Sequence, residues 1–150
     1  MDKKLVIIPT YNEKENIENI IRVTFDLGDY HILIIEDNSP DGTAEIVKKL
    51  IGEYPDRLFI IERKGKLGLG TAYITGFKWA LEHEYDYVFE MDADFSHNPN
   101  DVPRLYQACK EGADLAIGSR YCNGISVINW PIGRVIMSYY ASVYVRTVLG

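Results

Sequence analysis

The chain has 150 residues, of which 47% are hydrophobic and 12% aromatic, so it suits one packed domain and not an intrinsically disordered chain. Its 16 basic and 22 acidic residues give a net charge of −6, which argues against nucleic acid as a partner, because that binding depends largely on lysine and arginine contacts to phosphate. No uncharged apolar run reaches the roughly 18 residues of a membrane-spanning helix, no signal-peptide pattern is present, and two cysteines are too few for a disulfide framework.

Short apolar runs alternate with longer amphipathic segments over the first 118 residues. The runs predict strands at 5–8, 32–35, 58–61, 87–91 and 115–118. Between them, apolar residues at helical spacing predict four helices, whose inward faces would carry Ile17, Ile20, Ile21 and Phe25; Ile46, Val47, Leu50 and Ile51; Tyr73, Phe77, Ala80 and Leu81; and Val102, Leu105, Ala108 and Cys109. This order, with strands that are apolar on both faces, predicts an α/β fold with a mostly parallel sheet and helices on both faces.

The C-terminal quarter differs from the rest in charge and pattern. Residues 115–150 contain no Asp or Glu, but they include Arg120, Arg134 and Arg146. A final helix is predicted after Pro131, with apolar residues from 132 to 144, and the chain ends directly behind it. Since nothing follows that would cover this helix, we expect one domain over 1–150 whose C-terminal part is missing.

Polar residues follow the end of every predicted strand. They occupy 9–13, 36–42, 63–70, 92–97 and 119–120. In an open parallel sheet the ligand crevice lies beyond the carboxyl ends of the strands. The sequence therefore predicts a ligand site at this edge of the sheet.

The pair Asp92 and Asp94 is the first chemical candidate at that edge. Two carboxylates at a strand end suit Mg²⁺ or Mn²⁺, held partly by substrate phosphates, although a turn or a helix cap explains the bare pattern equally well. Asp37 also follows a strand and is placed to accept hydrogen bonds from a base or a ribose, whereas Asp41 and Ser39 have the character of helix caps.

The remaining candidates each have a simpler alternative. Glu13 would favour the positive N-terminus of the first helix, Tyr11 would serve as a packing residue, and the glycines of 65–70 would form a flexible surface loop. These glycines match neither the dinucleotide fingerprint nor the P-loop, and no arrangement of Ser, Cys and His indicates a covalent nucleophile.

Five segments, taken in order, resemble family 2 glycosyltransferases. They are Pro-Thr-Tyr-Asn-Glu at 9–13, Glu-Asp-Asn-Ser-Pro-Asp-Gly at 36–42, Lys-Leu-Gly-Leu-Gly-Thr-Ala-Tyr at 66–73, Asp-Ala-Asp-Phe-Ser-His at 92–97 and Gly-Ser-Arg-Tyr at 118–121. Within that family the chain most resembles the dolichol-phosphate (polyprenol-phosphate) mannose synthases, from residue 5 to about 140.

The resemblance implies a Rossmann-like GT-A fold and a set of site residues. By that resemblance the nucleotide sugar would be bound by Pro9, Tyr11, Glu13, Ile35, Asp37, Asp92, Ala93 and Asp94, and the metal by Asp92, Asp94 and Ser96. Ser96 stands where some relatives have Gln, so its shorter hydroxyl would reach the metal through water. Arg120, Arg134 and Ser138 would bind the acceptor phosphate, with Asp94 and Arg120 as catalytic residues.

The resemblance also implies an activity for this catalytic domain. It is the inverting transfer of mannose from GDP-mannose to a polyprenol or dolichol phosphate, with Mg²⁺ or Mn²⁺ as cofactor, by a cytoplasmic protein held peripherally at the cytoplasmic face of a membrane. Two alternatives stay open: a family 2 enzyme with a hydroxyl acceptor in polysaccharide or glycan assembly, and a non-catalytic fragment that binds a nucleotide sugar.

Overall fold

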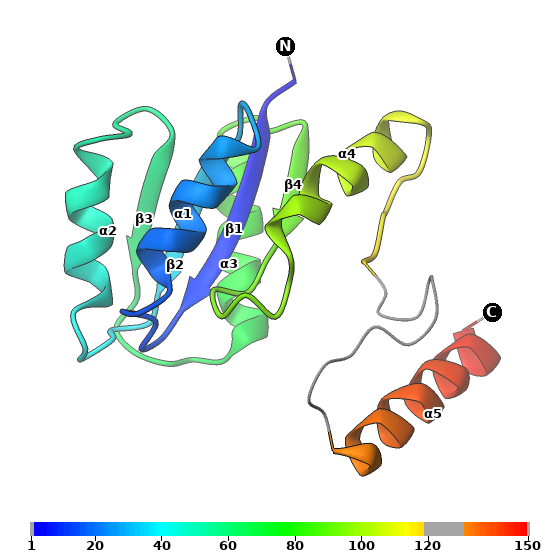
Figure 1. Ribbon diagram of the computed structural model, residues 1–150. Helices are drawn as coiled ribbons and strands as arrows, with labels where there is room; N and C mark the ends of the chain where they lie inside the picture. The colour runs from blue at the N-terminus through cyan, green and yellow to red at the C-terminus, as the bar shows by residue number, and fades with distance from the viewer. Residues whose placement is uncertain (1, 119–130, 150) are drawn as a thin grey trace. The chain divides into compact units, whose positions relative to one another are not determined.

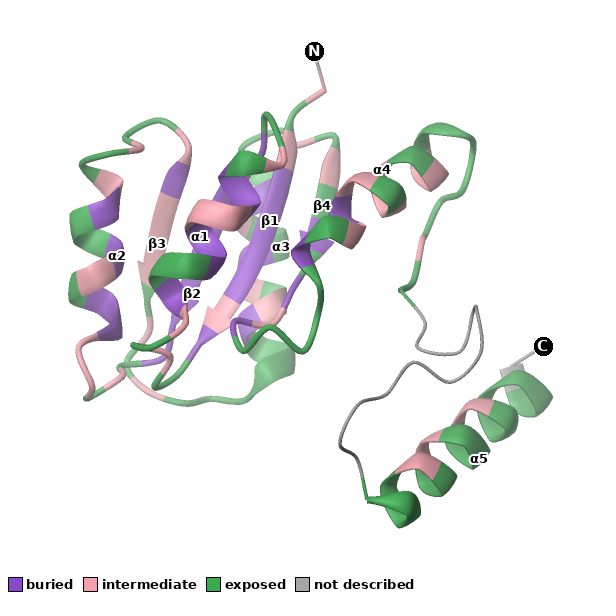
Figure 2. Cartoon of the chain, viewed as in Figure 1, coloured by how far each residue is buried: buried purple, intermediate pink, exposed green. Residues whose placement is uncertain are grey.

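A four-stranded parallel sheet forms the core of the first 116 residues in the computed structural model, which describes residues 2–118 and 131–149 (Figure 1). Its strands are β1 (Lys4–Thr10), β2 (His31–Glu36), β3 (Leu58–Glu62) and β4 (Tyr87–Glu90), in the order β3-β2-β1-β4. The apolar runs of β1 and β2 are buried on both faces, as central parallel strands require (Figure 2). These four strands confirm the prediction of a parallel sheet.

Helices cover both faces of this sheet. Alternate residues of β1 and β2 point to opposite faces, so Val6 and Ile8 pack against α1 (Ile17–Asp26), α2 (Thr43–Ile51) and α4 (Val102–Lys110), which follows the short helix η1 (Pro99–Asp101). Leu5 and Ile7 pack on the other face against α3 (Leu69–Glu82). The predicted α/β architecture with helices on both faces is confirmed.

The buried face of α3 differs from the predicted one. Ala72, Gly76 and Ala80 are buried, whereas Leu81 and Phe77 of the predicted inward face are exposed. A β-carbon on Gly76 would lie only 2.7 Å from the Cδ1 and Cγ2 atoms of Ile7, so α3 approaches β1 too closely for larger residues. The closeness of this approach, which hydropathy does not reveal, selects the small residues for the inner face.

The predicted strand at 115–118 is absent. These residues are described without strand pairing, and Leu115 and Ile117 are each 76% exposed. An apolar run forms a strand when a neighbouring strand pairs with its backbone and a helix covers its side chains. No described segment supplies either one here, so apolar composition alone does not produce the strand.

The described residues form two compact units, 1–116 and 117–150. The second contains α5 (Ile132–Leu149), which confirms the predicted final helix and exposes several large apolar side chains, among them Ile136, Met137 and Tyr140. Within the described part of the chain, no helix has both the length and the hydropathy to cross a membrane.

Candidate functional site

A cavity of about 270 Å³ opens where the loops that follow β1, β2 and β4 meet the N-terminal turn of α3. It is lined by Pro9, Thr10, Tyr11, Glu13, Asp37, Lys66, Leu69, Ala72, Asp92, Ala93 and Asp94. Every predicted nucleotide-sugar residue except Ile35 is in this lining. Ile35 is fully buried, with its side chain in the core on the α3 side of the sheet, so the structure does not bring it to the cavity.

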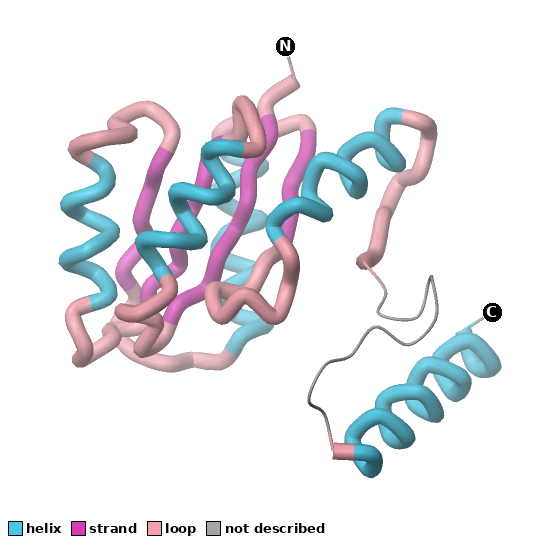
Figure 3. The backbone as a smooth tube through the Cα atoms, viewed as in Figure 1, coloured by secondary structure: helices cyan, strands magenta, loops and turns pink. Residues whose placement is uncertain are grey.

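The loop that follows β1 and the loop that follows β2 lie side by side and are joined by hydrogen bonds (Figure 3). The amide of Asn12 donates to Ser39 Oγ at 3.1 Å, and the amide of Glu13 donates to Thr43 Oγ1 at 3.0 Å. The amide of Lys14 donates to Asp41 Oδ2 at 3.0 Å. Polar side chains of the second loop and the start of α2 thus hold the backbone of the first.

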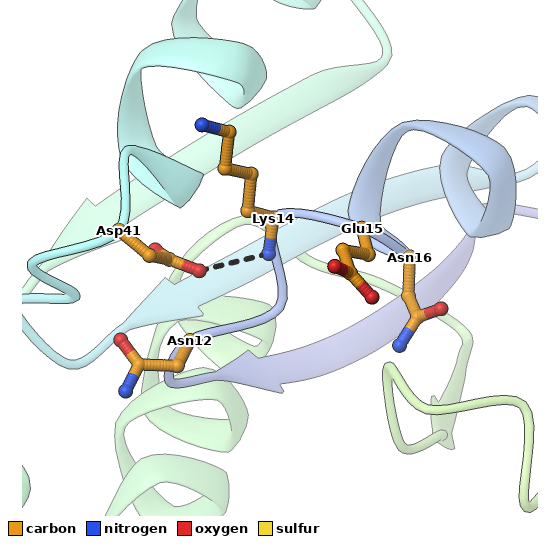
Figure 4. A pocket seen from close by; sticks show the side chains of 5 residues that line it. All are labelled: Asn12, Lys14, Glu15, Asn16 and Asp41. Atoms are coloured by element: carbon orange, nitrogen blue, oxygen red, sulfur yellow. Dashed lines mark hydrogen bonds between the residues drawn. The ribbon is translucent and has the colours of Figure 1, made fainter.

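Asp41 takes part in these hydrogen bonds between the two loops and does not line the 270 Å³ cavity. It accepts hydrogen bonds from the amide of Thr43 at 3.0 Å and from the Thr43 hydroxyl at 2.6 Å, at the start of α2, but the N-cap residue of this helix is Gly42 and not the predicted Asp41 or Ser39. Desolvation alone would raise the pKa of Asp41, but the hydrogen bonds from Thr43 and Lys14 outweigh it and lower this pKa. Figure 4 shows Asp41 beside a second hollow of about 220 Å³, which it lines with Asn12, Lys14, Glu15 and Asn16.

Asp37 forms a buried ion pair with Arg63, which follows β3. Arg63 Nε and Nη2 donate to the two carboxylate oxygens of Asp37 at 2.5 and 2.6 Å, and each side chain is only 8% exposed. Arg63 also donates to Thr71 Oγ1 at 2.8 Å, at the start of α3. The pair therefore links the ends of β2 and β3 to α3, and the sequence analysis did not assign a site role to Arg63. Its position at a strand end next to that of Asp37 is the signal that could have found it.

Asp92 and Asp94 follow β4, as the sequence predicted, and both line the cavity. Asp92 Oδ1 accepts a hydrogen bond from the Tyr73 hydroxyl at 3.3 Å, and the Asp92 amide donates to His97 Nδ1 at 3.2 Å. Asp94 Oδ1 accepts from the Ser96 amide at 2.9 Å, and hydrogen bonds from Ser96 lower the pKa of Asp94. These hydrogen bonds favour the charged form of Asp94. In the structure Ser96 donates a hydrogen bond to Asp94, and its role as a metal ligand stays a prediction.

The donor set fits a metal bound jointly with a phosphate ligand. Among the described residues, no group of three or more acidic, His or Cys side chains is arranged to hold a metal alone. Mg²⁺ and Mn²⁺ prefer oxygen ligands, and in nucleotide sites Mg²⁺ is bound through one or two carboxylates plus substrate phosphates. Asp92 and Asp94 provide such a pair of carboxylates.

Lys66, Tyr11 and Thr10 line the same cavity as these acids. Lys66 Nζ lies 4.6 Å from the centre of the Tyr11 ring, a cation–π contact in which both side chains line the cavity. Thr10 Oγ1 is buried and has no hydrogen-bond partner among the described residues.

The predicted acceptor residues are not among the described residues of the first unit. Arg120 lies outside the described residues, and Arg134 and Ser138 are on α5, in the second unit. Arg134 and Ser138 are four residues apart on one helix, so they share a face as predicted. Their role in binding a phosphate stays a prediction.

Comparison with known proteins identifies relatives over nearly the whole chain. Residues 5–146 match the profile described as Glycosyl transferase family 2. The chain is 48% identical over 149 residues to the polyprenol monophosphomannose synthase of Mycolicibacterium smegmatis. The aligned region covers 99% of this chain and 56% of that protein. It is 44% identical over 147 residues to the undecaprenyl-phosphate mannosyltransferase of Micrococcus luteus. Here the aligned region covers 97% of this chain and 60% of that protein. The chain thus spans a little over half the length of these curated relatives.

A solved structure supports the fold. The crystal structure of S. aureus TarS 1–349 matches with a TM-score of 0.58 and 23% identity, over 73% of this chain and 32% of that one. This likeness concerns the fold alone. Together with the parallel sheet and its two helical layers, it confirms the predicted GT-A class of fold.

Proposed function

Because the chain belongs to glycosyltransferase family 2, we propose that it binds a nucleotide sugar in the cavity at the carboxyl ends of β1, β2 and β4 and takes part in transfer of the sugar to a polyprenol phosphate. One observation carries the proposal: an aromatic ring, a buried acid and a pair of carboxylates line one cavity, contributed by Tyr11, Asp37 and Asp92 with Asp94. The relatives named above as a mannose synthase and a mannosyltransferase support mannose as the sugar.

The nucleoside occupies the Tyr11 and Asp37 end of the cavity. The Tyr11 ring offers a stacking surface, and the Asp37 carboxylate, whose two oxygens each accept one hydrogen bond from Arg63, has further lone pairs for a base or a ribose. GDP-mannose is the donor that the resemblance to the mannose synthases implies. Glu13 and Pro9 shape the wall on the β1 side.

The diphosphate lies toward Asp92 and Asp94. Asp92 and Asp94 would hold a Mg²⁺ or Mn²⁺ ion together with the phosphates, and such an ion would supply positive charge to offset that of the leaving diphosphate. Hydrogen bonds from Ser96 lower the pKa of Asp94, which favours its charged form. Ser96 would contribute by orienting Asp94, and its short hydroxyl would reach a metal only through water.

The acceptor is a phosphate monoester on a polyprenol or dolichol chain. A phosphate monoester has a second pKa of about 6, so it is anionic at neutral pH and needs orientation more than a general base. Direct attack by its oxygen on the sugar carbon inverts the configuration there. Arg120, Arg134 and Ser138 would hold this phosphate, since the guanidinium fork binds phosphate oxygens in pairs.

A lipid acceptor places the protein at a membrane surface, on the cytoplasmic side, where nucleotide sugars are supplied. The exposed apolar residues of α5, such as Ile136, Tyr140 and Val143, offer a surface along which a polyprenyl chain could lie. The proposal therefore includes peripheral association through α5.

Two measurements on the 150-residue chain test the proposal. Isothermal titration of GDP, with UDP as the competing nucleotide, should show binding that Mn²⁺ strengthens and that Asp94→Asn weakens. Asp101→Asn is the matched control, because Asp101 is a carboxylate at the start of α4 that pairs with Arg104 and does not line the cavity. Unchanged Mn²⁺ dependence in Asp94→Asn would remove Asp94 from the site.

Transfer is measured separately, as radiolabelled mannose moving from GDP-mannose into polyprenyl phosphate in detergent micelles. Product that forms with the phosphate acceptor and not with free polyprenol supports the proposed reaction. Binding without transfer would favour a fragment that binds the nucleotide sugar only. Transfer to a hydroxyl acceptor in its place would favour a role in glycan assembly.

A further inference from the structure

The hydroxyl of Tyr73 is the side-chain group of α3 that reaches the acidic pair. It lies 3.3 Å from Asp92 Oδ1, while the ring of Tyr73 is half-buried against the face of the sheet that α3 covers. In this hydrogen bond the Tyr73 hydroxyl is the donor and Asp92 Oδ1 is the acceptor. One oxygen of Asp92 is thus held by a side chain of α3.

Asp92 needs such support because of its place in the fold. It follows β4, which lies at the end of the strand order, and its side chain is 37% exposed. Its amide donates to His97 Nδ1, and His97 Nε2 lies 3.7 Å from Asp92 Oδ2. Tyr73 therefore contacts one carboxylate oxygen of Asp92 and His97 lies near the other, which limits rotation of the group.

The position of Tyr73 is set by the close contact between α3 and β1. Ala72, its neighbour, is fully buried and lines the cavity, and Gly76 one turn later leaves no room for a β-carbon beside Ile7. A helix held this closely cannot shift without a clash in the core. The Tyr73 hydroxyl is therefore held within hydrogen-bonding distance of Asp92 Oδ1.

We propose that Tyr73 is a positioning residue for the metal and diphosphate end of the cavity, acting through its hydrogen bond to Asp92. This inference rests on the proposed function for the nature of the ligand. It adds the Tyr73 hydroxyl to the part of the site that α3 contributes through Leu69 and Ala72, and it gives the last residue of the 66–73 segment a task that packing of its ring does not require. The ring itself stacks with Phe77 at 6.4 Å between centroids, a contact that Tyr73→Phe preserves.

The test is a titration with Mn²⁺ up to high concentration, because two carboxylates without the phosphate ligand bind the ion only weakly, followed by electron paramagnetic resonance of the free ion. Tyr73→Phe should raise the dissociation constant of the site about three- to tenfold, the effect expected on losing a weak hydrogen bond to a charged acceptor. Tyr85→Phe is the matched control, since Tyr85 is also a half-buried tyrosine whose hydroxyl has one partner, His31 Nδ1 at 2.7 Å, at the opposite end of β4. This control should leave the affinity for Mn²⁺ unchanged.

A second series shows whether Tyr73 acts through Asp92. In an Asp92→Asn background, Tyr73→Phe should cause no further loss of Mn²⁺ affinity. Equal affinity of Tyr73→Phe and the wild type, an additive loss in the Asp92→Asn background, or no binding of Mn²⁺ to the wild type would each overturn the inference. A lower unfolding midpoint with unchanged affinity would also overturn it, because that is the result of a purely structural role. Failure of GDP to bind the wild type would overturn the proposed function, while the Mn²⁺ series would still decide the role of Tyr73.

Discussion

Removal of the Arg63 guanidinium should destabilise the fold far more than removal of a similar surface group. In the wild type the Asp37 side chain is only 8% exposed, and its oxygens accept two hydrogen bonds from Arg63 at 2.5 and 2.6 Å. Arg63→Ala removes both of these hydrogen bonds. Breaking one side of a buried pair costs about 3–5 kcal/mol. Since Asp37 lines a cavity that admits water, we expect the lower end, about 3 kcal/mol in the free energy of unfolding.

The assay is urea denaturation at pH 7, with Arg22→Ala as the matched control. Arg22 contacts Glu53 through the same kind of paired geometry, at 2.9 and 3.2 Å, but these side chains are 39% and 43% exposed. Water and salt screen such a pair, so its loss should change the free energy of unfolding much less. The double variant Arg63→Ala/Asp37→Ala should recover part of the loss, because no buried carboxylate is left unpaired. If Arg63→Ala cost no more than Arg22→Ala, the pair would not be a buried structural link.

Three further results are expected. Asp94→Asn should weaken Mn²⁺-dependent binding of GDP about tenfold or more, measured by calorimetry, because it removes a charged ligand; its affinity without metal should stay nearly unchanged. The folded-state pKa of Asp41 is lowered, so its stabilising effect is present above the unfolded pKa of about 3.9 and is lost as the pH falls through the folded value. The stability difference between wild type and Asp41→Ala, from urea melts, should therefore be constant above about pH 5 and shrink below about pH 4. Gly76→Ala should destabilise by about 1–2 kcal/mol through overpacking against Ile7, whereas Gly70→Ala, where a β-carbon meets open space, should be neutral or slightly stabilising; a harmless Gly76→Ala would mean that α3 can move away from the sheet.

The strands and helices of residues 4–110 were predictable because each has a periodicity that burial enforces. The runs of β1 and β2 are apolar at every position, which only a strand covered on both faces explains, and α1 buries Ile17, Ile20 and Ile21 at helical spacing. The strand expected at 115–118 failed for the opposite reason, since pairing depends on segments elsewhere in the chain. Composition carries no information about whether a partner strand is at hand.

The sequence predicts which residues follow the strand ends and so reach the site. It does not predict which side chains these residues contact. Pro9, Tyr11 and Glu13 reach the cavity because they follow a strand that ends there. The link of Arg63 to Asp37 depends on β3 lying beside β2, and the reach of Tyr73 to Asp92 depends on how closely α3 approaches β1. Both are three-dimensional distances, which sequence spacing does not encode. Ile35 shows the converse, since a residue next to the site in the chain can still point into the core.

The hydrogen bonds between the first two loops have a consequence for the thermodynamics of binding. Three consecutive amides, from Asn12 to Lys14, donate to side chains of Ser39, Thr43 and Asp41. The backbone next to Tyr11 has therefore lost its conformational freedom when the chain folds, before any ligand arrives. A nucleotide that docks here orders little of this wall, so more of its contact energy is available as affinity. The same amides should exchange with solvent more slowly than loop amides that make no hydrogen bond.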